Sequence, residues 1–120
     1  MKKYLNIVNK VHKSPYKLTI VSSGGGTNAI SALLEVPGAS NTILESHIHY
    51  SKESMNLYLN KKPDHYCSLD TCLNMAANAF KKSKQIDATS KTKHLLGISI
   101  TANLATTYEK KGDHKFFIVV

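Results

Sequence analysis

Hydrophobic and polar residues follow one another along the chain in blocks that predict helices and strands in turn. Apolar positions at helical spacing predict a helix over residues 4–13. Ser14-Pro15 is expected to end it, because the residue before a proline is pushed away from helical angles. The β-branched run 17–22 predicts a strand, and a second helical period from Ala29 predicts a helix that ends at Val36-Pro37-Gly38.

Helical spacing and strand alternation of apolar residues continue through the middle of the chain. Residues 43–50 alternate as a strand. Ser51 is the expected N-cap of a short helix that ends at Leu59, and Ser68 is the expected N-cap of a longer one. The apolar side chains expected on one side of the longer helix are Leu73, Ala76, Ala77 and Phe80.

The last third is less regular. The lysine-rich stretch 81–93 is expected to be in part a solvated loop. Two β-rich runs, 94–101 and 115–120, predict strands, and the hydrophilic residues 109–113 between them predict a hairpin turn. Alternation of helices and strands predicts one α/β domain over residues 1–120, with helices layered on a mixed sheet.

Composition adds constraints on partners. A chain of 120 residues closes about one core. The net charge is +8, and all sixteen basic residues are lysines. Without arginine the chain lacks the planar guanidinium group that forms paired hydrogen bonds to base edges, so nucleic acid is not the expected partner. The lysines are interpreted as a solvated surface. No apolar stretch is long enough to span a bilayer, which favours a cytoplasmic protein without membrane contact. Cys67 and Cys72 have neither redox nor zinc spacing and are interpreted as reduced thiols.

The first candidate site is the glycine run between the first strand and the helix that follows it. Backbone amides of such a loop and of the helix N-terminus favour an anion. The residues predicted to bind that ligand are Gly24, Gly25, Gly26, Thr27 and Asn28. The spacing is not a P-loop, and its match to the relaxed dinucleotide fingerprint is weak. The alternative is a tight turn that binds nothing.

Two further sets of side chains carry possible chemistry. Glu45, His47 and His49 share one face of a strand, which is a chelating arrangement for zinc, but a solvent-facing polar face gives the same pattern and is favoured. The hydroxyls of Ser23, Tyr50, Thr101 and Tyr108 are candidates for nucleophilic chemistry. A serine nucleophile needs a base within reach, which sequence separation does not show.

Several of these motifs together resemble one family. They occur in order over residues 18–120 and are Ser23-Gly24-Gly25-Gly26, Val36-Pro37-Gly38-Ala39-Ser40, Glu45, Tyr50-Ser51-Lys52-Glu53-Ser54, Cys67-Ser68 and the stretch 97–106. The chain resembles the CinA C-terminal domain family, which includes nicotinamide mononucleotide deamidases, and is most similar to the branch with a triple-glycine loop. The resemblance implies a three-layer α/β/α sandwich on a mixed sheet, without the last strand and helix of the deamidases.

The resemblance also implies site residues. The family's serine nucleophile falls on Ser23, its tyrosine on Tyr50 and its threonine on Thr101, and no metal or cofactor is implied. The family's lysine base falls on Met55, whose thioether cannot accept a proton. Lys52 lies three residues earlier, and Ala102-Asn103-Leu104-Ala105 replaces a second glycine loop.

These departures favour a degenerate member that binds a small anion, such as a pyridine mononucleotide, without deamidase activity. The first alternative is an amidohydrolase that uses Ser23. The second is an oligomerising interaction module, because family members associate and an uncovered sheet edge invites pairing.

Overall fold

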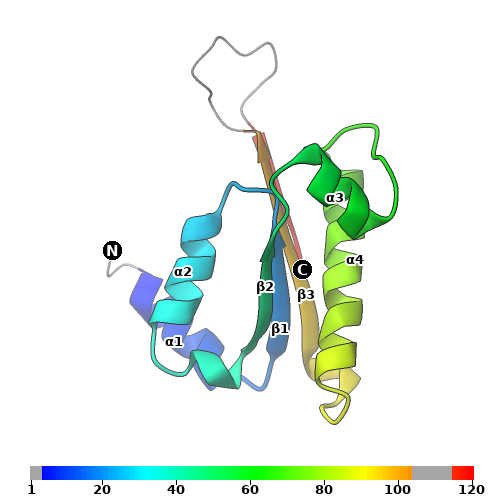
Figure 1. The fold of residues 1–120 in the computed structure, drawn as a ribbon. Helices are drawn as coiled ribbons and strands as arrows, with labels where there is room; N and C mark the ends of the chain where they lie inside the picture. The colour runs from blue at the N-terminus through cyan, green and yellow to red at the C-terminus, as the bar shows by residue number, and fades with distance from the viewer. Residues whose placement is uncertain (1–3, 104–114) are drawn as a thin grey trace.

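The structure is a computed structural model that describes residues 4–103 and 115–120. Its sheet has four strands in the order β2-β1-β3-β4 (Figure 1): β1 is Lys17–Ser22, β2 Ile43–Ile48, β3 Leu95–Asn103 and β4 Lys115–Val119. β1 pairs in parallel with both β2 and β3, and β4 pairs antiparallel with β3. The predicted turn at 109–113 and Tyr108 lie outside the described residues.

Helices cover both faces of this sheet. α1 (Leu5–Lys13) and α2 (Thr27–Glu35) lie on one side, and α3 (Lys52–Leu59) and α4 (Leu69–Ile86) lie on the other (Figure 1). Two short 3-10 helices, Ala39–Asn41 and Thr92–His94, precede β2 and β3. The predicted three-layer α/β/α sandwich on a mixed sheet is therefore confirmed.

The helices on the second side begin where the sequence predicts. The Ser51 hydroxyl accepts a hydrogen bond from the Ser54 amide, and the Ser68 hydroxyl accepts one from the Thr71 amide. Each serine satisfies an amide that the first helical turn leaves unpaired, which stabilises a helix by about 1 kcal/mol. Ser51 therefore fixes the start of α3, and Ser68 fixes the start of α4 at the end of the segment that connects the two helices.

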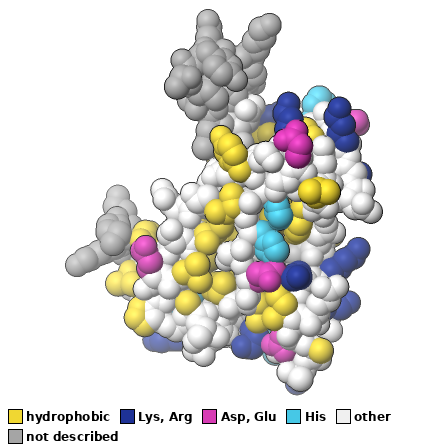
Figure 2. Space-filling view, in the orientation of Figure 1, with side chains coloured by type: hydrophobic (Ala, Val, Ile, Leu, Met, Phe, Trp, Pro, Cys, Tyr) yellow, Lys and Arg dark blue, Asp and Glu magenta, His cyan; other side chains and the backbone are white. Residues whose placement is uncertain are grey.

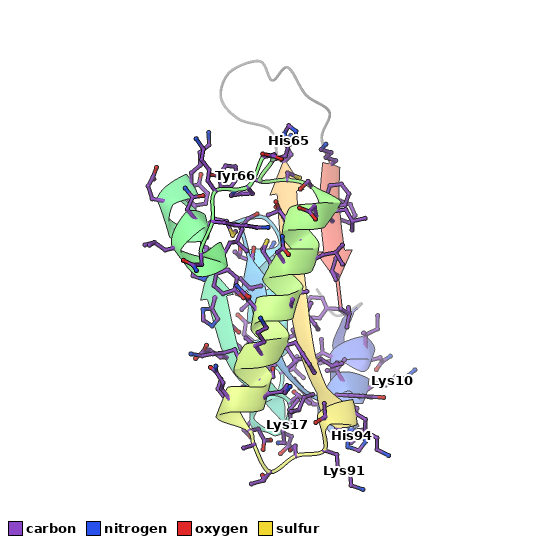
Figure 3. All side chains as sticks on the ribbon, turned by 90° about the vertical axis from the view of Figure 1, so that its right-hand side faces the viewer. Lys10, Lys17, His65, Tyr66, Lys91 and His94 are labelled. Carbon is purple, nitrogen blue, oxygen red and sulfur yellow. The ribbon has the colours of Figure 1, made fainter. Side chains whose placement is uncertain are left out.

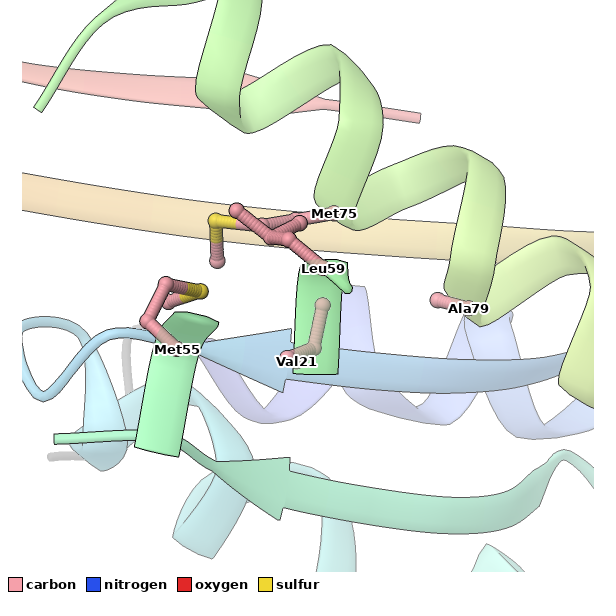
Figure 4. Close-up of a cluster of buried hydrophobic side chains, with 5 residues drawn as sticks. All are labelled: Val21, Met55, Leu59, Met75 and Ala79. Carbon is pink, nitrogen blue, oxygen red and sulfur yellow. The ribbon is translucent and has the colours of Figure 1, made fainter. Parts of the chain in front are cut away.

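A hydrophobic cluster joins α3 and α4 to the sheet. Val21, Met55, Leu59, Met75 and Ala79 pack together there and are all buried (Figure 4). A second cluster, formed by Leu18, Ile20, Ile30 and Ile100, lies between α2 and the other face of the sheet. β1 contributes to both clusters, which is why five of its six residues are buried.

Two predictions about these elements need correction. β2 ends at Ile48, so His49 and Tyr50 follow the strand. The sheet-facing side of α4 is also different, because Leu73 and Ala77 are exposed. Its buried residues are Thr71, Cys72, Met75, Ala76, Ala79 and Ser83. The predicted loop in part of the lysine-rich stretch is confirmed, and it begins at Asp87, after α4 ends at Ile86.

β4 is at one edge of the sheet, where it pairs with β3. Phe116 and Ile118 on this strand are exposed by 67% and 56%. Uncovered apolar edges favour association, and a homo-oligomer stays a prediction. In the described part of the chain, none of the helices has the length and apolar character needed to cross a membrane.

Candidate functional site

A cavity of about 710 Å³ opens at the carboxyl ends of the three parallel strands. Residues that follow β1 and β2, the start of α3, the segment between α3 and α4, the end of β3 and the start of β4 form its wall. The lining residues are Ser23, His49, Tyr50, Lys52, Met55, Lys62, Pro63, Asp64, His65, Tyr66, Cys67, Ser68, Thr101, Ala102, Asn103 and Lys115. The volume is that of a small-molecule site.

The chain direction explains why a cavity forms at this edge. After β1 the chain runs to α2 on one side of the sheet, and after β2 it runs to α3 on the other (Figure 1). The two connections leave neighbouring strands toward opposite faces of the sheet, and residues of both line the cavity. Open α/β sheets bind ligands at such positions.

Two of the predicted catalytic hydroxyls meet inside this cavity. The Ser23 hydroxyl donates a hydrogen bond to Thr101 Oγ1 at 3.1 Å, and Thr101 Oγ1 donates to the Tyr66 carbonyl at 3.0 Å. The chain of hydrogen bonds from Ser23 through Thr101 therefore ends at a neutral carbonyl oxygen, which is a weak base. Thr101 orients Ser23 but does not activate it.

Tyr50 and Met55 also line the cavity, and they differ in character. The Tyr50 side chain is 83% exposed, and its ring lies against Gly24. Met55 is 1% exposed and belongs to the hydrophobic cluster beneath α3. The position on which the resemblance places a lysine base is therefore part of the hydrophobic core.

The glycine loop turns away from the cavity after Ser23. Gly24 and Gly26 have φ of 128° and 86°, which glycine adopts without strain. The Ser22 hydroxyl donates to the Gly25 carbonyl at 2.6 Å and accepts from the Gly24 amide at 3.0 Å. Residues Gly24 to Gly26 and the first α2 residues, Thr27 and Asn28, are not among the cavity's lining residues. Anion binding by this loop stays a prediction.

The positive charges of the wall come from elements that the sequence does not relate to one another. Lys52 lies on α3, Lys62 follows α3, and Lys115 begins β4. All three are exposed, and Asp64 is the one carboxylate among the described lining residues. Three lysines at one mouth favour an anionic ligand.

His47 on β2 and His49, which follows the strand, form a column beneath α3 and α4. The Glu45 carboxylate is paired with His47 Nε2 and lies 3.9 Å from Lys82 Nζ. The His47 and His49 ring centroids are 5.5 Å apart, and His49 stacks on Tyr58 at 4.3 Å. Figure 2 shows histidines with an acidic and a basic side chain on this face.

Glu45 and His47 are two residues apart on β2, and His49 follows the strand, so the predicted single strand face holds only for the first two. All three side chains have partners from the protein. Within residues 4–103 and 115–120, no three histidine, cysteine or acidic side chains are arranged to hold a metal ion. Glu45 is engaged by His47 and Lys82. The column is a polar network beneath α3 and α4.

Burial lowers the pKa of His49 from its ordinary value of 6.5, and the neighbouring His47 lowers that pKa further. Tyr58 also faces this ring, and burial followed by the charge of Glu45 raises the Tyr58 pKa to about 12. His49 is therefore neutral in the folded chain at pH 7, with a free nitrogen lone pair.

This shift predicts a pH-dependent stability. As pH falls through 6.5 the unfolded chain binds a proton at His49 before the folded chain does, so the free energy of unfolding decreases. Urea titrations between about pH 8 and 5.5 are expected to show a smaller decrease for His49→Gln than for the parent chain. Equal slopes for the parent and His49→Gln would contradict the shift.

The two cysteines are free thiols in different environments. Cys72 is buried, and burial raises the pKa of its thiol. Its sulfur lies 3.1 Å from Ser99 Oγ. Cys67 is half-buried in the cavity wall, and its thiol donates to the Lys115 carbonyl at 3.7 Å. Cys67 and Cys72 are not bonded to each other, and their reduced state stays a prediction.

Part of the site has no signal in the sequence. Lys62, His65 and Tyr66 lie on the segment between α3 and α4, for which the sequence predicts neither a helix nor a strand. His65 and Tyr66 lie at one end of the molecule, and Lys10, Lys17, Lys91 and His94 lie at the other (Figure 3). His49, for which the sequence indicates metal binding, also lines the cavity.

Comparisons with known proteins identify the fold. No family model and no curated protein sequence matches the chain. The structure of a competence-damaged protein (CinA) superfamily protein from Escherichia coli is similar to this chain, with a TM-score of 0.65 and 12% sequence identity. The match covers 99% of this chain and 76% of the length of that protein. The competence/damage inducible protein CihA from Agrobacterium tumefaciens matches 81% of this chain at a TM-score of 0.58 and 17% identity. The match spans 55% of that protein's length. The chain therefore has the fold of CinA-superfamily proteins.

Proposed function

We propose that this domain binds a small anionic ligand of mononucleotide size in the cavity at the carboxyl ends of β1, β2 and β3. The observation that carries the proposal is the composition of the cavity wall. Three lysines at its mouth supply charge, two hydroxyls inside it supply hydrogen bonds, and Tyr50 and Tyr66 supply rings. A pyridine mononucleotide has a phosphate, a ribose and a flat ring, which are complementary to these groups.

Calorimetric titration with nicotinamide mononucleotide tests this proposal. Saturable heat is expected, with weaker binding of nicotinamide riboside, because the riboside lacks the phosphate that the lysines attract. Absence of heat from the mononucleotide at about 1 mM, a ligand concentration that detects a free energy of binding near −4 kcal/mol, would overturn the proposal.

An amidohydrolase that uses Ser23 is a second candidate function. It is favoured by the 3.1 Å hydrogen bond that orients the Ser23 hydroxyl inside the cavity. The base cannot be the family's lysine, because Met55 occupies that position. Release of ammonia from nicotinamide mononucleotide, lost in Ser23→Ala, is the expected result. Release that persists in Ser23→Ala would exclude this function.

A further inference from the structure

His49 and Ser23 are the residues that directly follow the paired strands β2 and β1, and both line the cavity. The pairing of the strands places Val21 opposite His47 and Ser22 opposite Ile48. The His49 amide continues this register by donating to the Ser22 carbonyl at 2.9 Å, and the Ser23 amide donates to the Ile100 carbonyl at 3.1 Å. His49 and Ser23, each one residue beyond its strand, thus continue in register with Thr101 of β3, and neighbouring strands of a sheet are about 4.8 Å apart.

The side chains of His49, Ser23 and Thr101 lie on the same face of the sheet. Ser23 contacts Thr101, whose hydroxyl binds the Tyr66 carbonyl, and His49 contacts Ser54 and Tyr58 of α3. Thr101 is on one side of Ser23, and His49 is on the other. Since a serine side chain has three staggered χ1 rotamers, a rotation about χ1 moves its hydroxyl from the threonine side toward the histidine side.

The imidazole of His49 is held at one nitrogen and free at the other. Nδ1 is 2.9 Å from Ser54 Oγ, and the ring stacks on Tyr58. Nε2 is buried and has no hydrogen-bond partner among the described residues. A buried nitrogen without a partner is uncommon in folded proteins and requires an explanation. A proton on Nδ1, directed at Ser54, leaves the Nε2 lone pair as the acceptor.

We propose that His49 is the general base that activates Ser23, in place of the lysine that Met55 replaces. This inference rests on the second candidate function, in which Ser23 is the nucleophile. His49 and Ser23 both line the cavity, so a bound carbonyl group is accessible to the serine. Ser54 is a positioning residue that fixes the histidine ring.

The proposed reaction balances with water as the second reactant. Ser23 Oγ attacks the carbonyl carbon of a carboxamide while Nε2 takes the hydroxyl proton. The C–N bond breaks, and the imidazolium returns that proton to the leaving nitrogen as ammonia departs. Water then attacks the acyl-serine, gives a proton to Nε2 and forms the carboxylic acid, and the proton returns to Ser23 Oγ. General base catalysis of this kind contributes about 100-fold or more to the rate.

A fluorophosphonate probe tests the proposal without knowledge of the substrate. It phosphonylates an activated serine, releases fluoride and is located by peptide mass spectrometry. Labelling of Ser23 is expected in the parent chain, with a rate about 100-fold lower in His49→Gln and unchanged in the matched control His94→Gln. Labelling of Ser23 that is equally fast in His49→Gln, or absent from the parent chain, would overturn the proposal.

Two further readouts separate a base from a merely structural histidine. Free imidazole is expected to restore labelling in His49→Ala, and failure to restore it in a variant that circular dichroism shows to be folded counts against the base. The parent rate is expected to reach half its maximum below pH 6.5. Other titratable side chains lie nearby: His47 and Tyr58 face His49, and Lys52, Asp64 and His65 line the same cavity. Variants of these residues show whether the pH dependence of the labelling rate belongs to His49.

This test is independent of the calorimetric one. Labelling that depends on His49 in a chain that does not bind nicotinamide mononucleotide would overturn the proposed ligand and support the base. Binding of the mononucleotide without labelling of Ser23 would support the ligand and overturn the base.

Discussion

Gly97→Ala is expected to destabilise the domain by about 3 kcal/mol, at the upper end of the cost of overpacking a core. A Cβ at position 97 of β3 would lie 2.2 Å from the Phe80 amide nitrogen and 2.4 Å from the Ala76 carbonyl oxygen. Both are backbone atoms of α4, so no side chain can rotate to make room. The helix would have to move away from the sheet.

Urea unfolding followed by circular dichroism measures this effect. Gly97→Ser is expected to cost at least as much, because it carries the same Cβ. Ile98→Val, on the other face of the same strand, is the control, and it is expected to cost about 1 kcal/mol by loss of one methylene. A loss for Gly97→Ala no larger than for this control would show that α4 does not pack against β3 at Gly97.

Simultaneous Lys52→Met, Lys62→Met and Lys115→Met changes are expected to weaken the binding of nicotinamide mononucleotide by about 10- to 100-fold. All three lysines line the cavity and are exposed. An exposed ion pair contributes up to about 1 kcal/mol, so three give about 1.5 to 3 kcal/mol at low salt. The residual affinity comes from the hydroxyls and rings of the wall.

The chain offers a matched control for this charge change. Lys10→Met, Lys17→Met and Lys91→Met remove the same charge at the end of the molecule opposite His65 and Tyr66 (Figure 3). Calorimetry at two salt concentrations is expected to show nearly parent affinity for the control variant. Equal weakening in the two variants would mean that net charge, and not the cavity, attracts the ligand.

Much of the fold could be predicted from the chain because its signals are local. Ser51 and Ser68 cap α3 and α4 as expected, and β1 coincides with the predicted strand. The buried side of α4 could not be predicted, because the helix has two rows of apolar residues at helical spacing and either row could face the sheet. The row that contains Cys72 and Met75 faces the sheet instead of the row with Leu73 and Ala77, and that choice depends on contact with β3.

The candidate site divides in the same way. Ser23 and Thr101 could be placed together because they lie near the carboxyl ends of neighbouring parallel strands. Lys62 and Tyr66 could not be placed in the site from the sequence, because the polar segment between the two helices has no regular apolar spacing that would relate it to the edge of the sheet. His49 was visible as part of an alternating strand, but its place beside Ser23 depends on the register between β1 and β2.

Amide chemical shifts of the ¹⁵N-labelled chain, titrated with nicotinamide mononucleotide, test the central claim most directly. A ligand in the cavity is expected to shift the amides of Ser23, Tyr66, Thr101 and Lys115, which come from four separate segments and meet only at this wall. Lys91 and His94, at the opposite end, are expected to stay unchanged (Figure 3). Shifts that spread over the surface lysines, or that centre on residues outside the cavity, would contradict it.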